Sequence, residues 1–415
     1  MNGITTISGQ NSVRLRIPGT AGWSRTMLIN SLSRIEYGRI LIKEGQNRWI
    51  FGKHAEPCAQ MTIHDPTAYR KIIFGGSIGA AEAYIDGLWD VDDLTALMRI
   101  MVGNMELLDK MEKGTAWLLK PFDLVRHLLS VNSRAGARKN ILAHYDLGND
   151  LYRSFLDSKM IYSSAIYPGP DSTLEESQLN KLDILCRKLD LQPGDSVIEI
   201  GSGWGGFALH AAATYGCHVT TTTISDAQYK EAARRIEDAG LKDRISLLKQ
   251  DYRDLTGSYD KLVSVEMIEA VGHRNMPVFF RKCGELLKPG GTMVHQAITI
   301  ADQKYRQYLR GVDFIQRYIF PGGCLTSLSR MVRLVAEQTD MVVRQLDDFG
   351  HDYARTLRDW RSRFDKHYPL LKKKGYDERF KRLWDFYLSY CEGGFVERSI
   401  SVVHLVADRP PDRLR

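Results

Sequence analysis

The chain has 415 residues, 43% of them hydrophobic and 26% charged, which suits two domains of ordinary globular composition. The 57 Lys and Arg residues exceed the 50 Asp and Glu residues by only seven, too few to indicate nucleic-acid binding, although such an excess suits an anionic lipid surface. The six cysteines form no Cys-x-x-Cys pair, which argues against a zinc site or a disulfide scaffold, and no apolar run reaches the roughly 18 residues of a membrane span.

The N-terminal part of the chain alternates short apolar segments with polar turns. Strands are expected within residues 13–17, 34–45, 48–52 and 60–64, and helices near 66–74, 80–84 and 91–105. The first residues do not place a basic segment before an apolar one, as a secretion signal would. We therefore expect a cytoplasmic protein.

Residues 117–140 differ in character from the segments around them. They combine aromatic residues and leucines with Lys120, Arg126 and further basic residues. We interpret them as the linker between an accessory, lipid-binding domain of residues 1–116 and a larger domain of residues 141–415. Two interpretations of the linker stay open: an amphipathic helix packed on its own domain, or a helix that lies on a membrane surface.

From about residue 180 onward, predicted strands alternate with predicted helices. The strands are expected at 196–200, 217–223, 244–249, 260–265 and 292–299, and the helices at 174–190, 205–215, 225–239 and 274–286. This alternation predicts an α/β fold in which helices cover both faces of a parallel sheet. The residues after 300 are expected to form further helices, rich in Tyr, Trp and Arg, that supply a lid or a substrate pocket.

Residues 197–207 carry the most informative pattern in the chain: an apolar strand that contains Glu199, then four glycines, then an Ala-rich helix. Glycines there let the backbone approach a nucleotide closely, and the helix N-terminus offers free N–H donors. The spacing Gly-x-Gly-x-x-Gly also fits a dinucleotide-binding loop, but the next strand ends in threonines rather than in the acid that holds the ribose of NAD. This weakens the NAD interpretation without excluding it.

Glu199, two residues before the first glycine, completes a pattern that resembles motif I of the S-adenosylmethionine (SAM)-dependent methyltransferases. The segment Leu287–Gly291 before the last predicted strand is similar to a turn of that superfamily, and Gln250–Arg253 lies where its members hold adenine. The resemblance implies a Rossmann-like class I methyltransferase sheet with helical lid insertions, formed by residues 141–415. The short strands and helices of the N-terminal segment are expected to form a smaller α+β domain.

Further segments resemble the cyclopropane-fatty-acyl-phospholipid synthase family, which includes the mycolic acid and plant cyclopropane synthases. They are His144–Tyr152, Tyr162–Ala165, Gly201–Gly205, Val265–His273 and Tyr318–Leu325. Gly76–Trp89 also resembles the extra domain of the bacterial phospholipid enzymes, so the likeness covers nearly the whole chain.

The family resemblance implies an enzyme that adds a methylene group across cis double bonds of phospholipid acyl chains, with SAM as methyl donor. The alkene attacks the methyl group, a carbocation forms, and a bound bicarbonate ion removes a proton before the cyclopropane ring closes. Since an alkene is a poor nucleophile, the site must hold it about 3–3.5 Å from the methyl group in a dry pocket. A cation in that pocket favours aromatic faces, for which the candidates are Tyr145, Tyr162, Tyr318, Phe320 and Tyr353.

By position in the motifs, the resemblance assigns residues to the two small ligands. Bicarbonate is expected to be held by Glu269, Gln296, Ile298, Tyr353 and the backbone of Ser164, with His144 in the wall of the site. SAM is expected to be held by Tyr162, Ser163, Glu199, Gly201, Gly203, Trp204, Thr223, Ile224, Gln228, Asp251 and Tyr252. The resemblance further implies a homodimer that associates peripherally with the inner face of an anionic membrane, without metal or nucleic acid.

Two residues depart from the family pattern. Ser164 stands where most members have Cys, and Gln296 stands where bacterial members have His, with His295 one place early. Three alternatives therefore stay open: an enzyme that makes a methyl-branched or methylene-bearing chain, a non-catalytic SAM- or lipid-binding protein and, as the least favoured, an NAD-dependent dehydrogenase.

Overall fold

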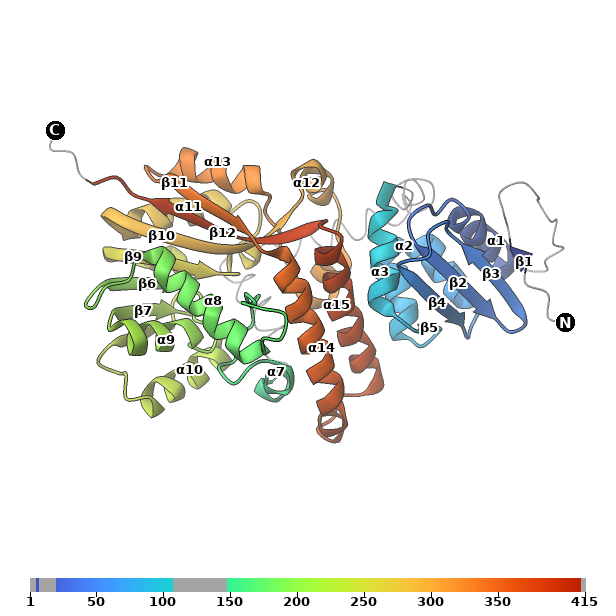
Figure 1. Ribbon diagram of the computed structural model, residues 1–415, viewed down its shortest axis with the longest axis horizontal. Coiled ribbons are helices and arrows are strands. Elements are labelled where there is room, and N and C mark those ends of the chain that lie inside the picture. The colour runs from blue at the N-terminus through green and yellow to red at the C-terminus, as the bar shows by residue number, and fades with distance from the viewer. Residues whose placement is uncertain (1–4, 7–19, 107–147, 412–415) are drawn as a thin grey trace. The chain divides into compact units, whose positions relative to one another are not determined.

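The computed structural model describes residues 5–6, 20–106 and 148–411, which form two compact units (Figure 1). One unit holds the N-terminal segments together with residues 311–314 and 368–399, and the other holds most of the rest. The predicted linker, His144 and Tyr145 lie outside the described residues. The predicted domain boundaries at 116 and 141 therefore stay predictions.

The first unit is built on a five-stranded sheet with the strand order β1-β3-β2-β4-β5. Its strands are β1 (Thr5–Thr6), β2 (Arg39–Glu44), β3 (Asn47–Phe51), β4 (Cys58–Ile63) and β5 (Trp89–Val91). Its helices are α1 (Thr20–Leu32), α2 (Thr67–Ile85), α3 (Leu94–Gly103) and α15 (Glu378–Val396). This sheet and its helices confirm the expected small α+β domain, and α15 adds to it a helix from the far end of the sequence, which packs on α2 and α3.

Local sequence explains most of this unit, with a few differences from expectation. Buried and more exposed residues alternate along β4, the pattern of a strand with one face in the core. The two helices expected on either side of Gly75–Gly79 form one helix, α2, which is kinked where Gly76 has a φ of 57°. Neither α1 nor β5 was expected, because the apolar residues of α1 form no single stripe and β5 has only three residues.

The second unit is built on a seven-stranded sheet with the strand order β11-β12-β10-β9-β6-β7-β8. Its strands are β6 (Ser196–Ile200), β7 (His218–Thr222), β8 (Ile245–Leu248), β9 (Tyr259–Val265), β10 (Leu287–Ile300), β11 (Val342–Asp348) and β12 (Ile400–Asp408). The strands from β10 to β8 run parallel, whereas β12 is antiparallel to both β10 and β11. This arrangement confirms the predicted α/β fold with a largely parallel sheet.

The helices of the second unit include all those expected before residue 300. They are α7 (Asn149–Phe155), α8 (Leu174–Leu189), α9 (Gly206–Tyr215), α10 (Asp226–Asp238), α11 (Met276–Leu286), α12 (Asp302–Tyr308), α13 (Leu328–Gln338) and α14 (Gly350–Lys373), with short turns at η2 (Tyr252–Asp254), η3 (Ile268–Ala270) and η4 (Ile315–Ile319). α8 begins at Leu174 because Thr173 and Glu176 form a capping box. Among the described residues, no helix combines the length and hydropathy needed to cross a bilayer.

The expectation of helices alone after residue 300 was incomplete, because β11 and β12 also lie there. β12 pairs with β10 along nine residues and extends the sheet beyond its parallel strands. Most of β12 is buried on both faces, so its sequence is a nearly continuous apolar run rather than an alternating one. β10 also begins at Leu287 rather than at 292.

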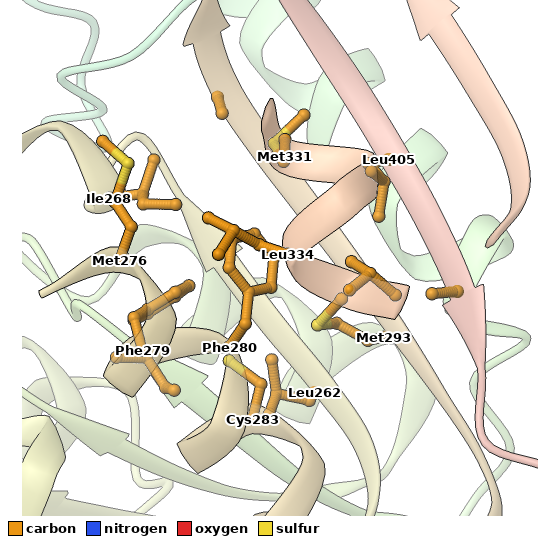
Figure 2. Close-up of a cluster of buried hydrophobic side chains, with 14 of the residues drawn as sticks. Leu262, Ile268, Met276, Phe279, Phe280, Cys283, Met293, Met331, Leu334 and Leu405 are labelled. Atoms are coloured by element: carbon orange, nitrogen blue, oxygen red, sulfur yellow. The ribbon is translucent and has the colours of Figure 1, made fainter. Parts of the chain in front are cut away.

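Alternate residues of the central strands point to opposite faces of the sheet and divide the core into two clusters. Leu262 and Met293 lie on one face with the side chains of α11 and α13, including Phe280 and Leu334 (Figure 2). Residues one position further along, such as Val263, lie on the other face against α8, α9 and α10. Helices thus cover both faces, which leaves the carboxyl edge of the parallel strands as the place for a ligand site.

Candidate active site

The glycine loop joins β6 to α9 at this carboxyl edge. Gly201, Gly203 and Gly205 have φ values of 102°, 49° and 87°, conformations that side-chain-bearing residues rarely adopt. A Cβ at Gly201 would also lie 3.0 Å from Cγ of Met267. Glycine is therefore required there for two independent reasons, and the loop leads directly into the N–H donors at the start of α9.

The side chain of Glu199 is buried where β6 pairs with β7. The residue is 3% exposed, and its Oε2 accepts a hydrogen bond of 2.5 Å from Thr221 Oγ1. Burial raises the pKa of its carboxyl to about 8, although the Thr221 hydroxyl and the charge of Lys181 act in the opposite direction. The sequence predicted a carboxylate that meets a cationic ligand, and the structure supplies Thr221 and Lys181 as its partners within the chain.

The residues expected to hold the adenosine part of SAM follow the next two strands. Thr223 Oγ1 donates to Gln228 Oε1 at 2.8 Å, and the Ser225 hydroxyl caps α10, while Ile224 between them is half-buried. Asp251 pairs with Arg253 at 2.6 Å, and Tyr252 packs edge-on against Phe279. These side chains lie at the ends of β7 and β8, beside the glycine loop in the sheet order.

Trp204 and Tyr162 belong to one cluster of aromatic rings. Trp204 is 1% exposed, donates from Nε1 to Asn149 Oδ1 at 3.0 Å, and packs on Tyr152 with ring centroids 4.8 Å apart. Tyr162 contacts Tyr152 at 5.3 Å and Trp360 at 5.3 Å. Phe320 lies 6.4 Å from Tyr162, so this member of the predicted aromatic set joins the cluster.

The groups expected to hold bicarbonate meet around one side chain, the carboxylate of Glu266. Its Oε1 accepts hydrogen bonds from the backbone N–H of Ser164 at 2.9 Å and from Nε2 of Gln296 at 2.7 Å. Its Oε2 accepts one from the Tyr353 hydroxyl at 2.7 Å. Burial raises the pKa of the Glu266 carboxyl, and these three donors oppose that rise. Three of the predicted residues are thus brought together, but on a glutamate that the sequence analysis did not select.

Glu269 and Ile298 form the neighbouring contact. Oε1 of Glu269 accepts a hydrogen bond of 2.6 Å from the backbone N–H of Ile298, and Oε2 is buried without a hydrogen-bond partner among the described residues. Burial, together with the negative charge of Glu266, raises the pKa of Glu269 to about 8. Since two adjacent buried carboxylates do not readily ionise together, Glu269 is the member that holds a proton at neutral pH.

Gln296 is oriented by a chain of hydrogen bonds behind it. Its Oε1 lies 2.9 Å from Nε2 of His404, whose Nδ1 lies 2.8 Å from Nζ of Lys188. An ammonium can only donate, so His404 carries its proton on Nε2 and donates to Gln296. Lys188 in turn pairs with Asp347 at 2.5 Å. The chain directs the amide N–H of Gln296 toward Glu266.

His295 points away from this site. It lies on the opposite face of β10 from Gln296 and packs against Phe279 and Phe280, with centroid distances of 5.5 and 6.0 Å. Burial lowers the pKa of its imidazole to about 4, so the ring is neutral.

Ser163 and Ser164 contribute mainly through backbone atoms and through a buried lysine. The Ser164 hydroxyl donates to the carbonyl of Ala165, away from the amide that binds Glu266. The Ser163 hydroxyl accepts a hydrogen bond of 2.6 Å from Nζ of Lys181. Burial lowers the pKa of Lys181 to about 8, against the charges of Glu266, Asp157 and Glu199. Lys181 is thus the cation that the three buried acids share.

The sequence analysis missed Glu266 and Lys181, although each left a signal. Glu266 directly follows strand β9, and Glu199 lies near the same carboxyl end of strand β6. Lys181 occupies the buried stripe of α8 between Ser177 and Leu185, where an apolar residue is expected. Among the described residues, no cluster of three or more His, Cys, Asp or Glu side chains is arranged to hold a metal ion.

Comparisons with known proteins agree with this geometry. Residues 132–405 match the family described as mycolic acid cyclopropane synthetase. The chain is 38% identical over 368 residues to tuberculostearic acid methyltransferase UfaA1 of Mycobacterium tuberculosis, covering 86% of each chain. It is 36% identical over 355 residues to cyclopropane-fatty-acyl-phospholipid synthase of Escherichia coli, covering 85% of this chain and 88% of the relative.

A solved structure also resembles this chain. The mycolic acid cyclopropane synthase CmaA1, determined with SAH and CTAB, has a TM-score of 0.61 and 27% sequence identity, and the match covers 65% of this chain and 98% of that one. The structural likeness confirms the class I methyltransferase fold that the sequence predicted.

Proposed function

Because the chain belongs to the mycolic acid cyclopropane synthetase family, we propose that it transfers the methyl group of SAM to the cis double bond of a phospholipid acyl chain. The chain is a methyltransferase, as its curated relatives are, which removes the non-catalytic alternative. A related enzyme was solved with SAH, the demethylated form of SAM, which favours SAM over NAD.

One observation carries the proposal: a buried carboxylate lies next to a cluster of aromatic rings. Tyr353 connects the two, since its hydroxyl donates to Glu266 while its ring packs edge-on against Trp360 at 6.0 Å. Trp360 then contacts Tyr162 and Phe155. Aromatic faces stabilise a cation through their quadrupoles, and a fixed carboxylate accepts a proton from it. An alkene that takes up a methyl cation needs both groups.

The residues at the glycine loop are proposed to bind SAM, which supplies an electrophilic methyl group when bound. Gly201 and Gly203 allow close approach of the backbone, and the start of α9 supplies N–H donors. The other residues proposed to hold SAM are Glu199 in β6, Thr223 after β7, Gln228 in the first turn of α10, and Asp251 and Tyr252 after β8. Trp204 supports the loop by packing, since its indole is buried and bonded to Asn149.

The part of the prediction that assigned a bicarbonate ion does not fit these residues. Ser164, Gln296 and Tyr353 already donate to Glu266, and the N–H of Ile298 already donates to Glu269. A second anion placed there would face the carboxylate of Glu266 without a free donor among these groups. We therefore derive no step through bicarbonate.

A cyclopropane ring is the proposed product, and a methyl-branched or methylene-bearing chain is the second candidate. One observation favours keeping the second: three donors that the family resemblance assigned to bicarbonate bind Glu266 instead. A different base would give the cation time to rearrange. The name of the relative from Mycobacterium tuberculosis, a tuberculostearic acid methyltransferase, agrees with that candidate. The name of the Escherichia coli relative agrees with the ring.

An acyl chain within a phospholipid is reached from a membrane surface, so the proposal includes peripheral association with the membrane. The net charge of +7 favours anionic lipid, to which each basic residue near the surface adds about 1 kcal/mol. The predicted homodimer stays a prediction.

The test uses the full chain with SAM and vesicles of a phosphatidylglycerol that carries cis-monounsaturated acyl chains. We expect each modified double bond to gain the mass of one CH₂ group, with one SAH formed for each. Vesicles with saturated chains of the same length are the matched control and should gain nothing. Chromatography of the fatty esters against a cyclopropane standard separates the two candidate products. If protein that binds SAM modifies no unsaturated lipid, the proposal is wrong.

A further inference from the structure

We propose that the carboxylate of Glu266 is the base of the reaction, a built-in replacement for bicarbonate. The inference rests on the proposed function and adds to it the group that receives the proton. It follows from the placement of one side chain on the three donors that the family resemblance had assigned to an anion.

The contacts of Glu266 are those of an anion site. Two of its donors, the Ser164 amide and the Gln296 amide group, bind Oε1, and the third, the Tyr353 hydroxyl, binds Oε2. A carboxylate has about four lone-pair positions, so three donors leave one position, on Oε2, to accept a proton. That oxygen also contacts the residue, Tyr353, that leads to the aromatic cluster.

The backbone at Glu266 indicates that this placement is specific. Its φ is 47°, in the left-handed region that glutamate avoids. Strained conformations of this kind persist where the surrounding structure fixes them, and they concentrate at functional sites. Three hydrogen bonds hold the side chain, and the amide of Glu266 donates to the carbonyl of Gln296 at 2.8 Å. The strained residue is therefore fixed at both its backbone and its side chain.

The charges around Glu266 fit a base that is ionised before the reaction. Lys181, fully buried nearby, interacts favourably with it, and the three donors favour its charged form. Of the two neighbouring acids, Glu269 is the one that is protonated, because fewer hydrogen-bond donors stabilise its charged form. Glu266 thus remains the acid of the pair that is free to accept a proton.

The proposed step balances in atoms and charge. The π electrons of the alkene form the new carbon–carbon bond to the methyl group, and the pair of the broken carbon–sulfur bond stays on sulfur. A C–H bond of the transferred methyl group then breaks, its electron pair closes the ring onto the cationic carbon, and the proton moves to Oε2 of Glu266. If a hydride shift comes first, the same pair forms a methylene double bond. The protonated carboxyl later returns its proton to solvent.

The test compares the full-length wild type with E266Q and E266G in buffer freed of carbon dioxide and in the same buffer with added bicarbonate. We expect the wild type to form lipid product at the same rate in both buffers. E266Q keeps the shape of the side chain but loses the base, so we expect a loss of about a hundredfold or more in both buffers, in the range of general-base catalysis. E266G suits the left-handed backbone and frees three donors, so we expect its activity to return as bicarbonate is added.

Calorimetry of bicarbonate binding supplies a readout that does not depend on the lipid. We expect binding to E266G and none to the wild type, whereas SAM binds both and shows that both are folded. If E266G does not fold, the wild type and E266Q still decide the question. The proposal is overturned if removal of bicarbonate inactivates the wild type, if the wild type binds bicarbonate, or if E266Q keeps wild-type activity. A complete lack of lipid product from the wild type would instead contradict the proposed function.

Discussion

The glycine loop and the carboxylate cluster lie at the same edge of the sheet but are built in different ways. The loop is one continuous segment, Gly201–Gly206, whose shape follows from glycines at positive φ. The carboxylate cluster, defined by Ser164, Glu266, Glu269, Gln296 and Tyr353, comes from separate segments of the chain that meet only in the fold. A local motif therefore reveals the cofactor side, whereas the chemistry depends on contacts that no short segment contains.

Mutations can therefore test SAM binding by the glycine loop separately from the chemical step at the carboxylate cluster. Changes in the loop should alter SAM affinity and leave the chemical step of bound SAM unchanged. Changes in the cluster should alter the chemical step and leave SAM affinity unchanged. The variants below are ordered by the size of the effect we expect.

The largest effect is expected from G201A. The new Cβ would lie 3.0 Å from Met267 Cγ on a backbone with φ of 102°, so the loop or Met267 must shift. We expect calorimetry to show SAM affinity reduced about a hundredfold, or roughly 2.7 kcal/mol. G194A is the matched control, since Gly194 has a φ of 87° but open space around its Cβ position. If G194A lost as much SAM affinity as G201A, backbone strain at a glycine of positive φ would explain the loss, and the position of Gly201 in the glycine loop would not.

A smaller effect is expected from Y353F, which removes the hydroxyl that binds Oε2 of Glu266. Hydrogen bonds to charged groups contribute about 1.5–3 kcal/mol, so we expect kcat to fall at least about tenfold with SAM affinity unchanged. Because that hydroxyl lowers the pKa of Glu266, its loss raises the pKa, and the acidic limb of the pH–rate profile moves to higher pH.

Y167F is the control for Y353F. The Tyr167 hydroxyl donates to Asp359 at 2.7 Å, outside the carboxylate cluster. We expect its pH–rate profile to match that of the wild type. An unchanged profile in Y353F would contradict the role of Tyr353 in the cluster.

A pH-dependent change in stability is expected from E269Q. Native Glu269 keeps its proton up to a pKa of about 8, whereas the unfolded carboxyl releases it near its ordinary value of 4.5. Between these values the native state binds more protons, so this carboxyl destabilises the wild type as the pH rises. The amide does not titrate. The melting temperature of E269Q should therefore rise relative to that of the wild type as the pH increases from about 5 to about 8.

E176Q is the control for the pH series. Hydrogen bonds from the backbone and hydroxyl of Thr173 lower the pKa of the exposed Glu176 carboxyl, so its contribution is complete above its ordinary pKa and is lost only in acid. Its difference from the wild type should stay constant from about pH 5 to about pH 8. A constant difference for E269Q as well would mean that Glu269 is ionised in the native protein.

The smallest effect is expected from S164C, which restores the residue most common in the family. The backbone N–H, not the side chain, binds Glu266, and the hydroxyl donates to Ala165. We expect kcat to change by less than about twofold, because the substitution keeps the backbone N–H that binds Glu266. A tenfold gain in kcat would show that the side chain at this position takes part in the reaction.

Sequence reasoning succeeded where the structure depends on local pattern. The alternation of strands and helices from 174 to 300 was predicted with nearly the observed boundaries, since caps such as Thr173 and Ser225 mark the helix starts. It missed β12, because a strand buried on both faces shows no alternation of apolar and polar residues. It also missed the place of α15 in the first unit, because that place depends on contacts with α2 and α3.

The candidate site shows the same limit. The family resemblance selected four residues that do lie close together: Ser164, Gln296, Ile298 and Tyr353. It also assigned bicarbonate as their ligand, whereas in the structure they bind Glu266 and Glu269. No pattern in the sequence indicates that Glu266 reaches all three donors, because its side chain turns inward from a left-handed backbone at the end of β9. Only the folded structure shows that the Glu266 side chain occupies the donors assigned to bicarbonate.

An experimental structure of the wild type with SAH, from crystals grown in bicarbonate, would show directly which group occupies the three donors. We expect both oxygens of Glu266 to bind the donors of Ser164, Gln296 and Tyr353, with no separate ion among them. A planar bicarbonate ion bound to those donors, with Glu266 turned away, would contradict this expectation.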